Sequence, residues 1–126
     1  MTGKKILVTE NHKFMRAYLE STLRGAGYEV RTASNAREAL EISAEFHPDL
    51  ILTSIQTPID CFGYAKVLRE QGHTGAIVEL ARGNSELEKY AKRHGVGPEY
   101  ISMITGSIQN SSKESMLRDI KKLMPQ

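Results

Sequence analysis

The sequence predicts an α/β fold, a five-stranded parallel sheet with helices on both faces. Five short apolar segments alternate with longer amphipathic segments, as expected of successive strand and helix units. In the first and third short segments the apolar residues are consecutive rather than alternating, which is typical of strands buried on both faces. A chain of 126 residues is near the common domain size, so we expect residues 1–126 to form one domain.

The first half of the chain predicts three strands and two helices. The expected strands are KKILVTE (4–10), YEVRTA (28–33) and DLILTSI (49–55). The first helix is indicated by apolar residues at helical spacing, namely Phe14, Met15, Tyr18, Leu19, Thr22 and Leu23, and it ends at Gly25 and Gly27. In the second helix, Asn35 is the expected N-cap and Glu38 completes a capping box. Pro48 ends that helix.

The second half predicts two further strands and three helices. A third helix is expected over about 61–71, followed by the strand AIVELA (76–81) and the charged helix SELEKYAKRHG (85–95). The fifth strand is predicted as EYISMI (99–104), and TGSIQNSS (105–112) as a polar loop. The closing helix SKESMLRDIKKLM (112–124) turns Met116, Leu117, Ile120 and Leu123 or Met124 inward.

Composition excludes several classes of protein. The net charge is +2 with both signs interspersed and no long Lys/Arg run, so direct nucleic-acid binding is not expected. Cys61 is the single cysteine, which rules out an internal disulfide and fits a reducing compartment. No apolar segment has the length of a signal peptide core or a membrane span. We therefore expect a cytoplasmic protein, or the first domain of a longer one.

Candidate site residues are those at the carboxyl ends of the predicted strands. In open parallel α/β sheets, ligands bind in the loops at this edge. The residues there are Glu10, Asn11, Ser54, Ala81, Arg82 and Met103.

Four segments, in this order, resemble the receiver domain of bacterial response regulators. They are KILVTENHKFMR, AGYEVRTASNAREALEI, PDLILTSIQTP and DCFGYAKVLRE. The resemblance implies a flavodoxin-like (βα)5 fold with strand order 2-1-3-4-5 and a role in two-component signal transduction. In that family a phosphoryl group passes from a phosphohistidine to an aspartate. Mg²⁺, a lysine and a Thr or Ser hydroxyl assist the transfer.

At the family's functional positions this chain has different residues. The acceptor position is Ser54, the acidic pair is Glu10 and Asn11, the hydroxyl position is Ala81 and the lysine position is Met103. No catalytic residue is therefore expected.

The metal site is expected to be vestigial. One carboxylate from Glu10, with Asn11, Ser54 and the Gln56 carbonyl, makes a poor site for Mg²⁺. We expect Mg²⁺ binding to be weak or lost, and no other cofactor.

These departures predict a degenerate receiver, or pseudo-receiver, that is not an enzyme and works through phosphorylation-independent protein contact. The expected surface is the fourth helix, fifth strand and fifth helix, with Tyr100, Lys89, Lys92, Arg93 and Lys121. Tyr100 matches an aromatic position of the family's fifth strand, and beside the small Ala81 it is expected to sit inward. The partner is expected to be a protein, a histidine kinase or an output domain being the candidates. The oligomeric state stays open.

Two alternatives remain. The first is a receiver that still accepts a phosphoryl group in a phosphorelay, at Ser54 or at nearby Asp60. The second is an enzyme with a flavodoxin-like fold. It is disfavoured because no Gly-rich phosphate loop follows the first strand and no nucleophile, base and acid converge.

Overall fold

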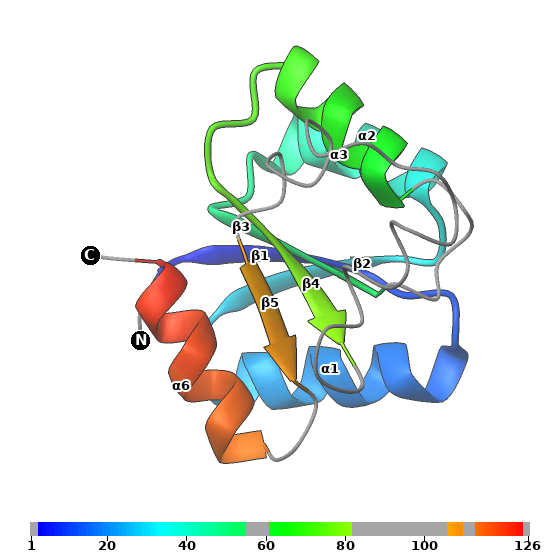
Figure 1. Cartoon of the computed structure of the whole chain (residues 1–126). Coiled ribbons are helices and arrows are strands. Elements are labelled where there is room, and N and C mark those ends of the chain that lie inside the picture. The colour runs from blue at the N-terminus through cyan, green and yellow to red at the C-terminus, as the bar shows by residue number, and fades with distance from the viewer. Residues whose placement is uncertain (1–2, 55–60, 82–105, 110–112, 125–126) are drawn as a thin grey trace.

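The computed structural model describes residues 3–54, 61–81, 106–109 and 113–124 of the chain. They form a five-stranded parallel sheet in the order β2-β1-β3-β4-β5. Helices α1 and α6 cover one face of this sheet, and α2 and α3 cover the other (Figure 1). The predicted fold class and strand order are confirmed.

The strands pair in a register that aligns their carboxyl ends. Their bounds are β1 Lys5–Thr9, β2 Glu29–Ala33, β3 Leu50–Ser54, β4 Ala76–Ala81 and β5 Gly106–Gln109. Thr9 lies opposite Ala33 on one side and Thr53 on the other. Farther along, Ser54 pairs with Leu80, and Ala81 pairs with Gln109.

The helices begin and end close to the predicted positions. They are α1 Lys13–Gly25, α2 Ala36–Phe46, α3 Cys61–Glu70 and α6 Lys113–Leu123. At the start of α2, the Asn35 side-chain oxygen accepts a hydrogen bond from the Glu38 N–H at 2.9 Å, which confirms the predicted N-cap. The Glu38 carboxylate accepts from the Ser34 hydroxyl at 2.6 Å. The helix ends at His47, which has a left-handed backbone (φ 51°) before Pro48.

The fifth strand lies in a segment that we predicted to be loop. β5 is Gly106–Gln109, so the prediction of a polar loop over 105–112 is wrong. β5 is the last strand in the sheet order and pairs with β4. An edge strand is held by its backbone hydrogen bonds and need not be apolar on both faces, so hydropathy missed it. The predicted strand 99–104 and the predicted helix 85–95 lie outside the described residues.

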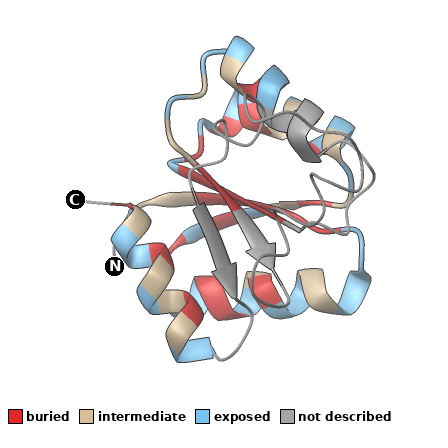
Figure 2. Cartoon of the chain, in the orientation of Figure 1, coloured by how far each residue is buried: buried red, intermediate tan, exposed pale blue. Residues whose placement is uncertain are grey.

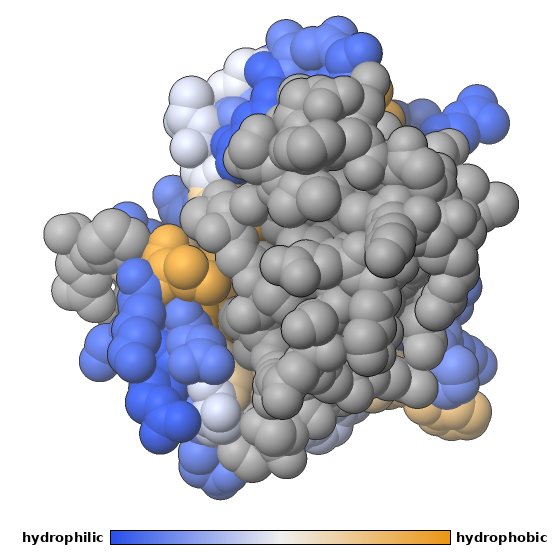
Figure 3. Space-filling view, viewed as in Figure 1, coloured by the Kyte–Doolittle hydropathy of each residue, from blue (hydrophilic) through white to orange (hydrophobic). Residues whose placement is uncertain are grey.

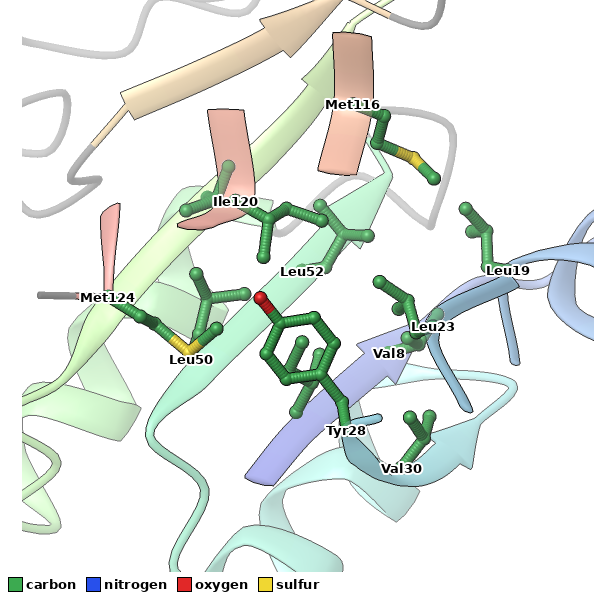
Figure 4. Packing of buried hydrophobic residues seen from close by; sticks show 12 residues of the cluster. Val8, Leu19, Leu23, Tyr28, Val30, Leu50, Leu52, Met116, Ile120 and Met124 are labelled. Carbon is green, nitrogen blue, oxygen red and sulfur yellow. The ribbon is translucent and has the colours of Figure 1, made fainter. Parts of the chain in front are cut away.

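The central strands are buried on both faces, as their continuous apolar residues predict. On the side of α1 and α6, strand residues pack with the two helices in one cluster (Figure 4). Its members include Ile6, Val8, Leu50, Leu52, Val78, Leu19, Leu23, Met116 and Ile120. Because side chains alternate along a strand, Leu7, Ile51 and Ile77 point to the opposite face, and all three are fully buried. Figure 2 shows this burial along the middle of the sheet.

Helix α1 buries fewer of its apolar residues than its periodicity predicts. Leu19, Thr22 and Leu23 are buried, and Met15 packs partly against the core. Phe14 is 77% exposed and Tyr18 is 44% exposed, although both recur at the same helical spacing as the buried residues. The six predicted positions span a wider arc of the helix than the sheet covers.

Candidate functional site at the carboxyl edge of the sheet

Four of the predicted site positions lie along one edge of the sheet. Glu10 and Asn11 directly follow β1, Ser54 is the last residue of β3, and Ala81 is the last residue of β4. The parallel register brings these strand ends together at the carboxyl edge. Gln56, Asp60, Arg82 and Met103 lie outside the described residues.

Glu10 is the carboxylate at this edge, and it is almost completely buried (1% exposed). Its backbone is fixed on both sides. The N–H donates to the Ala33 carbonyl at 2.9 Å, and the Glu10 carbonyl accepts from the Arg16 guanidinium at 2.9 Å. Among the described residues, its buried Oε2 atom has no hydrogen-bond partner. Burial of a carboxyl group without full hydrogen bonding is unfavourable, so this side chain is not explained by stability alone.

Arg16 is a residue at this site that the sequence reasoning missed. It lies in the second turn of α1, and its side chain reaches back to the carbonyl of Glu10. The pKa of Glu38 is lowered, chiefly by the hydrogen bond from the Ser34 hydroxyl, and the charge of Arg16 contributes to this shift. A guanidinium therefore lies close to the carboxyl end of β1. A basic residue one turn into the helix after the strand is the signal that would have found it.

The donor groups described at this edge fit a magnesium ion poorly. Mg²⁺ is bound in proteins through oxygen ligands in octahedral geometry, usually with one or two carboxylates. Here Glu10 supplies one carboxylate. Asn11 follows it in sequence, and Ser54 follows Thr53, the residue that pairs with Thr9. Within residues 3–54, 61–81, 106–109 and 113–124, no three His, Cys, Asp or Glu side chains gather in a way that would hold a metal ion.

The position at the carboxyl end of the fifth strand is Gln109. We had assigned the lysine position to Met103 and the aromatic position to Tyr100, on the basis of a strand over 99–104. The predicted strand over 99–104 lies outside the described residues, so both assignments stay predictions, and the strand described as β5 begins at Gly106. The strand GSIQ contains neither a lysine nor an aromatic residue, and Gln109 pairs with Ala81. Of the predicted contact residues, Lys121 is exposed on α6, while Lys89, Lys92, Arg93 and Tyr100 lie outside the described residues.

A hollow of about 580 Å³ lies at the opposite, amino edge of the sheet. It is lined by the end of α2 and by the turn before β4, including His47, Asp49, Gln71 and His73. The Nε2 atom of His73 is buried and has no hydrogen-bond partner in the part of the chain that the structure describes, and burial lowers the pKa of this imidazole. Because the hollow lies at the amino edge of the sheet, it is remote from Glu10 and Ser54 at the carboxyl edge.

No helix in the described part of the chain has the length and apolar character needed to cross a membrane.

Comparison with solved structures agrees with this architecture. The chemotaxis response regulator CheY4 of Vibrio cholerae is 26% identical and superimposes with a TM-score of 0.78, over 97% of this chain and 99% of that one. TrrA of Thermotoga maritima, solved in complex with Mg²⁺ and BeF, is 24% identical with a TM-score of 0.75, over 95% of this chain and 98% of that one.

Curated relatives match about two thirds of the chain. The probable transcriptional regulator ycf27 of Cyanophora paradoxa is 37% identical over 82 residues, which are 64% of this chain and 34% of that protein. PhoP of Bacillus subtilis, an alkaline phosphatase synthesis transcriptional regulatory protein, is 34% identical over 88 residues, 69% of this chain and 37% of that protein. This chain thus spans about a third of the length of these relatives. The family model of the response regulator receiver domain matches residues 6–97, and the chain belongs to this family.

Proposed function

We propose that this chain is a pseudo-receiver of a two-component system, which works through protein contact without being phosphorylated. The observation that supports it most is the residue at the tip of β3. Ser54 occupies the carboxyl end of this central strand, where the family's acceptor aspartate is expected. A hydroxyl cannot form an acyl phosphate, and as a nucleophile it needs a positioned base.

The surrounding substitutions support the same proposal. Glu10 is the single buried carboxylate described at the ends of β1, β3 and β4, and β5 ends in Gln109 rather than in a basic residue. Several carboxylates kept together without metal or lysine would leave buried like charges, which is costly. Loss of the acceptor, of one acidic residue and of the lysine together leaves a pocket with little charge.

The proposed partner is a protein, either a histidine kinase or an output domain. The curated relatives are named as transcriptional regulators, and this chain matches about a third of their length, so a DNA-binding output domain is a reasonable partner class. The proposed contact surface includes Lys121 of α6, together with Lys89, Lys92, Arg93 and Tyr100.

The proposal is tested by incubating the protein with acetyl phosphate and Mg²⁺ and measuring its intact mass. We expect no mass increase of one phosphoryl group. A receiver with an aspartate at the acceptor position, treated in parallel, is the positive control. TrrA, solved with Mg²⁺ and BeF, serves as the positive control for a thermal-shift titration with magnesium and beryllofluoride, to which this chain is expected not to respond.

The alternative, a receiver that still accepts a phosphoryl group at Ser54 or Asp60, is favoured by one observation. No described residue donates a hydrogen bond to the buried Oε2 atom of Glu10, and this alternative assigns that oxygen the binding of a cation or the role of a base. A stable adduct that disappears in Ser54→Ala or in Asp60→Asn would establish this alternative and overturn our proposal.

A further inference from the structure

The hollow at the amino edge of the sheet is a concave site that the proposed function does not use. Its volume of about 580 Å³ lies within the range of small-molecule sites in proteins. The end of α2 forms one wall, and the turn between α3 and β4 forms the other. The polar side chains that line it are Ser43, His47, Asp49, Gln71, His73 and Thr74.

The wall formed by the turn is held in a fixed position. The N–H of His73 donates to the Leu68 carbonyl at 3.0 Å, near the end of α3. The Arg69 guanidinium donates to the carbonyls of His73 and Gly75, at 3.0 and 2.7 Å. Gly75 in turn lies against the backbone of Asp49, where a Cβ would overlap the carbonyl oxygen. The two walls therefore meet in a close contact, and the hollow exists before a ligand enters, which lowers the entropic cost of binding.

The amino edge has a second hollow, and the two differ in charge. The second, of about 360 Å³, is lined by Lys4 and Arg69 and by the apolar end of α6, and it shares Asp49 with the first. Figure 3 shows pale and hydrophilic atoms over the turn between α3 and β4, and apolar atoms beside the end of α6. Among the described residues that line the first hollow there is no lysine or arginine, and Asp49 is the one carboxylate.

The end of α2 adds to the negative potential of the first hollow. The last turn of this helix contains no basic residue, and the carboxyl end of a helix carries a partial negative charge that favours a nearby cation. Burial lowers the pKa of His73, so this imidazole adds no positive charge at neutral pH.

Asp49 is exposed, and its carboxylate is held in place by one hydrogen bond. Its Oδ2 atom accepts from the Lys5 N–H at 2.8 Å. A carboxylate has about four acceptor sites, so this bond leaves room for further donors. The first hollow thus presents an accessible, oriented anion beside the negative end of a helix.

We propose that this hollow binds a small organic cation, a primary amine attached to an apolar ring or short chain. The ammonium group donates hydrogen bonds to the Asp49 carboxylate, and the apolar part lies against Ala44 and Pro48, which also line the hollow. An anion is repelled by the same carboxylate and by the end of α2. The site is remote from the carboxyl edge, so this inference adds a ligand-binding site to the proposed function and does not rest on it.

The test uses three ring compounds of similar shape and different charge, namely benzylamine, benzyl alcohol and benzoate. Binding to the full chain is measured at neutral pH by titration of NMR chemical shifts, which gives both the affinity and the residues affected. We expect benzylamine to shift the signals of residues 43–49 and 71–75, with an affinity roughly threefold or more above that of benzyl alcohol. Benzoate should cause no shifts in these two segments.

Two variants and a matched control locate the binding. Asp49→Asn removes the charge and keeps an oxygen that can accept from the Lys5 N–H, so it should lower the affinity for benzylamine to about that for benzyl alcohol. Ala44→Leu, at an exposed position of α2, places a larger side chain in the hollow and should weaken the binding of both compounds. Glu41→Gln removes one charge from the exposed side of α2 outside the hollow and should leave both affinities unchanged.

Several results would overturn this inference. They are binding of benzoate as tight as that of benzylamine, no saturable shifts with benzylamine, shifts confined to the second hollow or to the carboxyl edge, or an unchanged affinity in Asp49→Asn. Melting temperatures verify that the variants fold, and Ala44→Leu decides the test if Asp49→Asn does not. A phosphoryl adduct in the acetyl phosphate test would refute the proposed function and leave this binding site unaffected.

Discussion

Gly75 lies where the turn before β4 passes the backbone of Asp49. A Cβ at this position would overlap the Asp49 carbonyl oxygen and would lie 3.0 Å from His73 Cε1. We predict that Gly75→Ala lowers the free energy of unfolding by about 1–3 kcal/mol, because the Asp49 carbonyl belongs to the backbone and cannot turn aside as a side chain can. Gly25→Ala is the control, since its Cβ would meet open space, and it should leave stability equal or slightly higher. Urea denaturation of both variants measures the difference. If Gly75→Ala were as stable as Gly25→Ala, the predicted overlap with the Asp49 carbonyl would be contradicted.

His73 makes stability depend on pH. Burial lowers its pKa below the ordinary value of 6.5; the charge of Arg69 adds to this effect, and that of Asp49 opposes it. Between the folded and unfolded pKa values the unfolded chain binds more protons, so stability rises with pH there. The contribution is fully present above about pH 6.5 and is lost as the pH falls toward the folded pKa.

In the variant His73→Gln, the free energy of unfolding should depend less on pH below about pH 6.5. The measurement is urea denaturation from pH 5 to pH 8, with an NMR titration of the His73 ring in the wild type. If the free energy of unfolding changed with pH as steeply in the variant as in the wild type, a group other than His73 would be the cause of the pH dependence.

At the scale of the elements, the start of α2 depends on one side chain. Asn35 accepts the Glu38 N–H at 2.9 Å, which satisfies a backbone donor in the first turn that has no partner within the helix. We predict that Asn35→Ala costs about 1 kcal/mol in the free energy of unfolding. The conservative Asn35→Ser should retain most of the stability because serine caps equally well. If both variants were as stable as the wild type by thermal and urea denaturation, this cap would not contribute.

At the scale of the whole molecule, the sheet is buried under two separate helix layers. Ile51 and Leu52 are neighbours in β3, are 0% and 1% exposed, and point to opposite faces. Each truncation to alanine should cost about 2–5 kcal/mol, because each opens a cavity in a different layer. Val67→Ala, at a position 38% exposed, should change stability by less than about 0.5 kcal/mol. A small cost for only one of the core variants would show that its layer is loosely packed.

The sequence was sufficient to predict a helix or strand where the residues of that element alone contain the pattern that defines it. The consecutive apolar residues of β1 and β3 predicted burial on both faces, and Asn35 predicted the start of α2. The end of β3 also followed from sequence, so Ser54 could be assigned to the carboxyl edge before the structure was known. These features depend on periodicity and on hydrogen bonds between near neighbours, which a single sequence contains.

Only the tertiary structure decided the features that depend on distant neighbours. β5 is polar in sequence and is a strand because its backbone pairs with β4, so the strand that lies beside β4 ends at Gln109. Phe14 has the spacing of a core residue, yet the sheet does not extend over it. The burial of the Glu10 carboxyl and the approach of Arg16 likewise follow from how α1 packs beside β1. The pairing of one strand with another and the coverage of a helix by the sheet are properties of the assembled sheet. The sequence of a single strand or helix does not determine them.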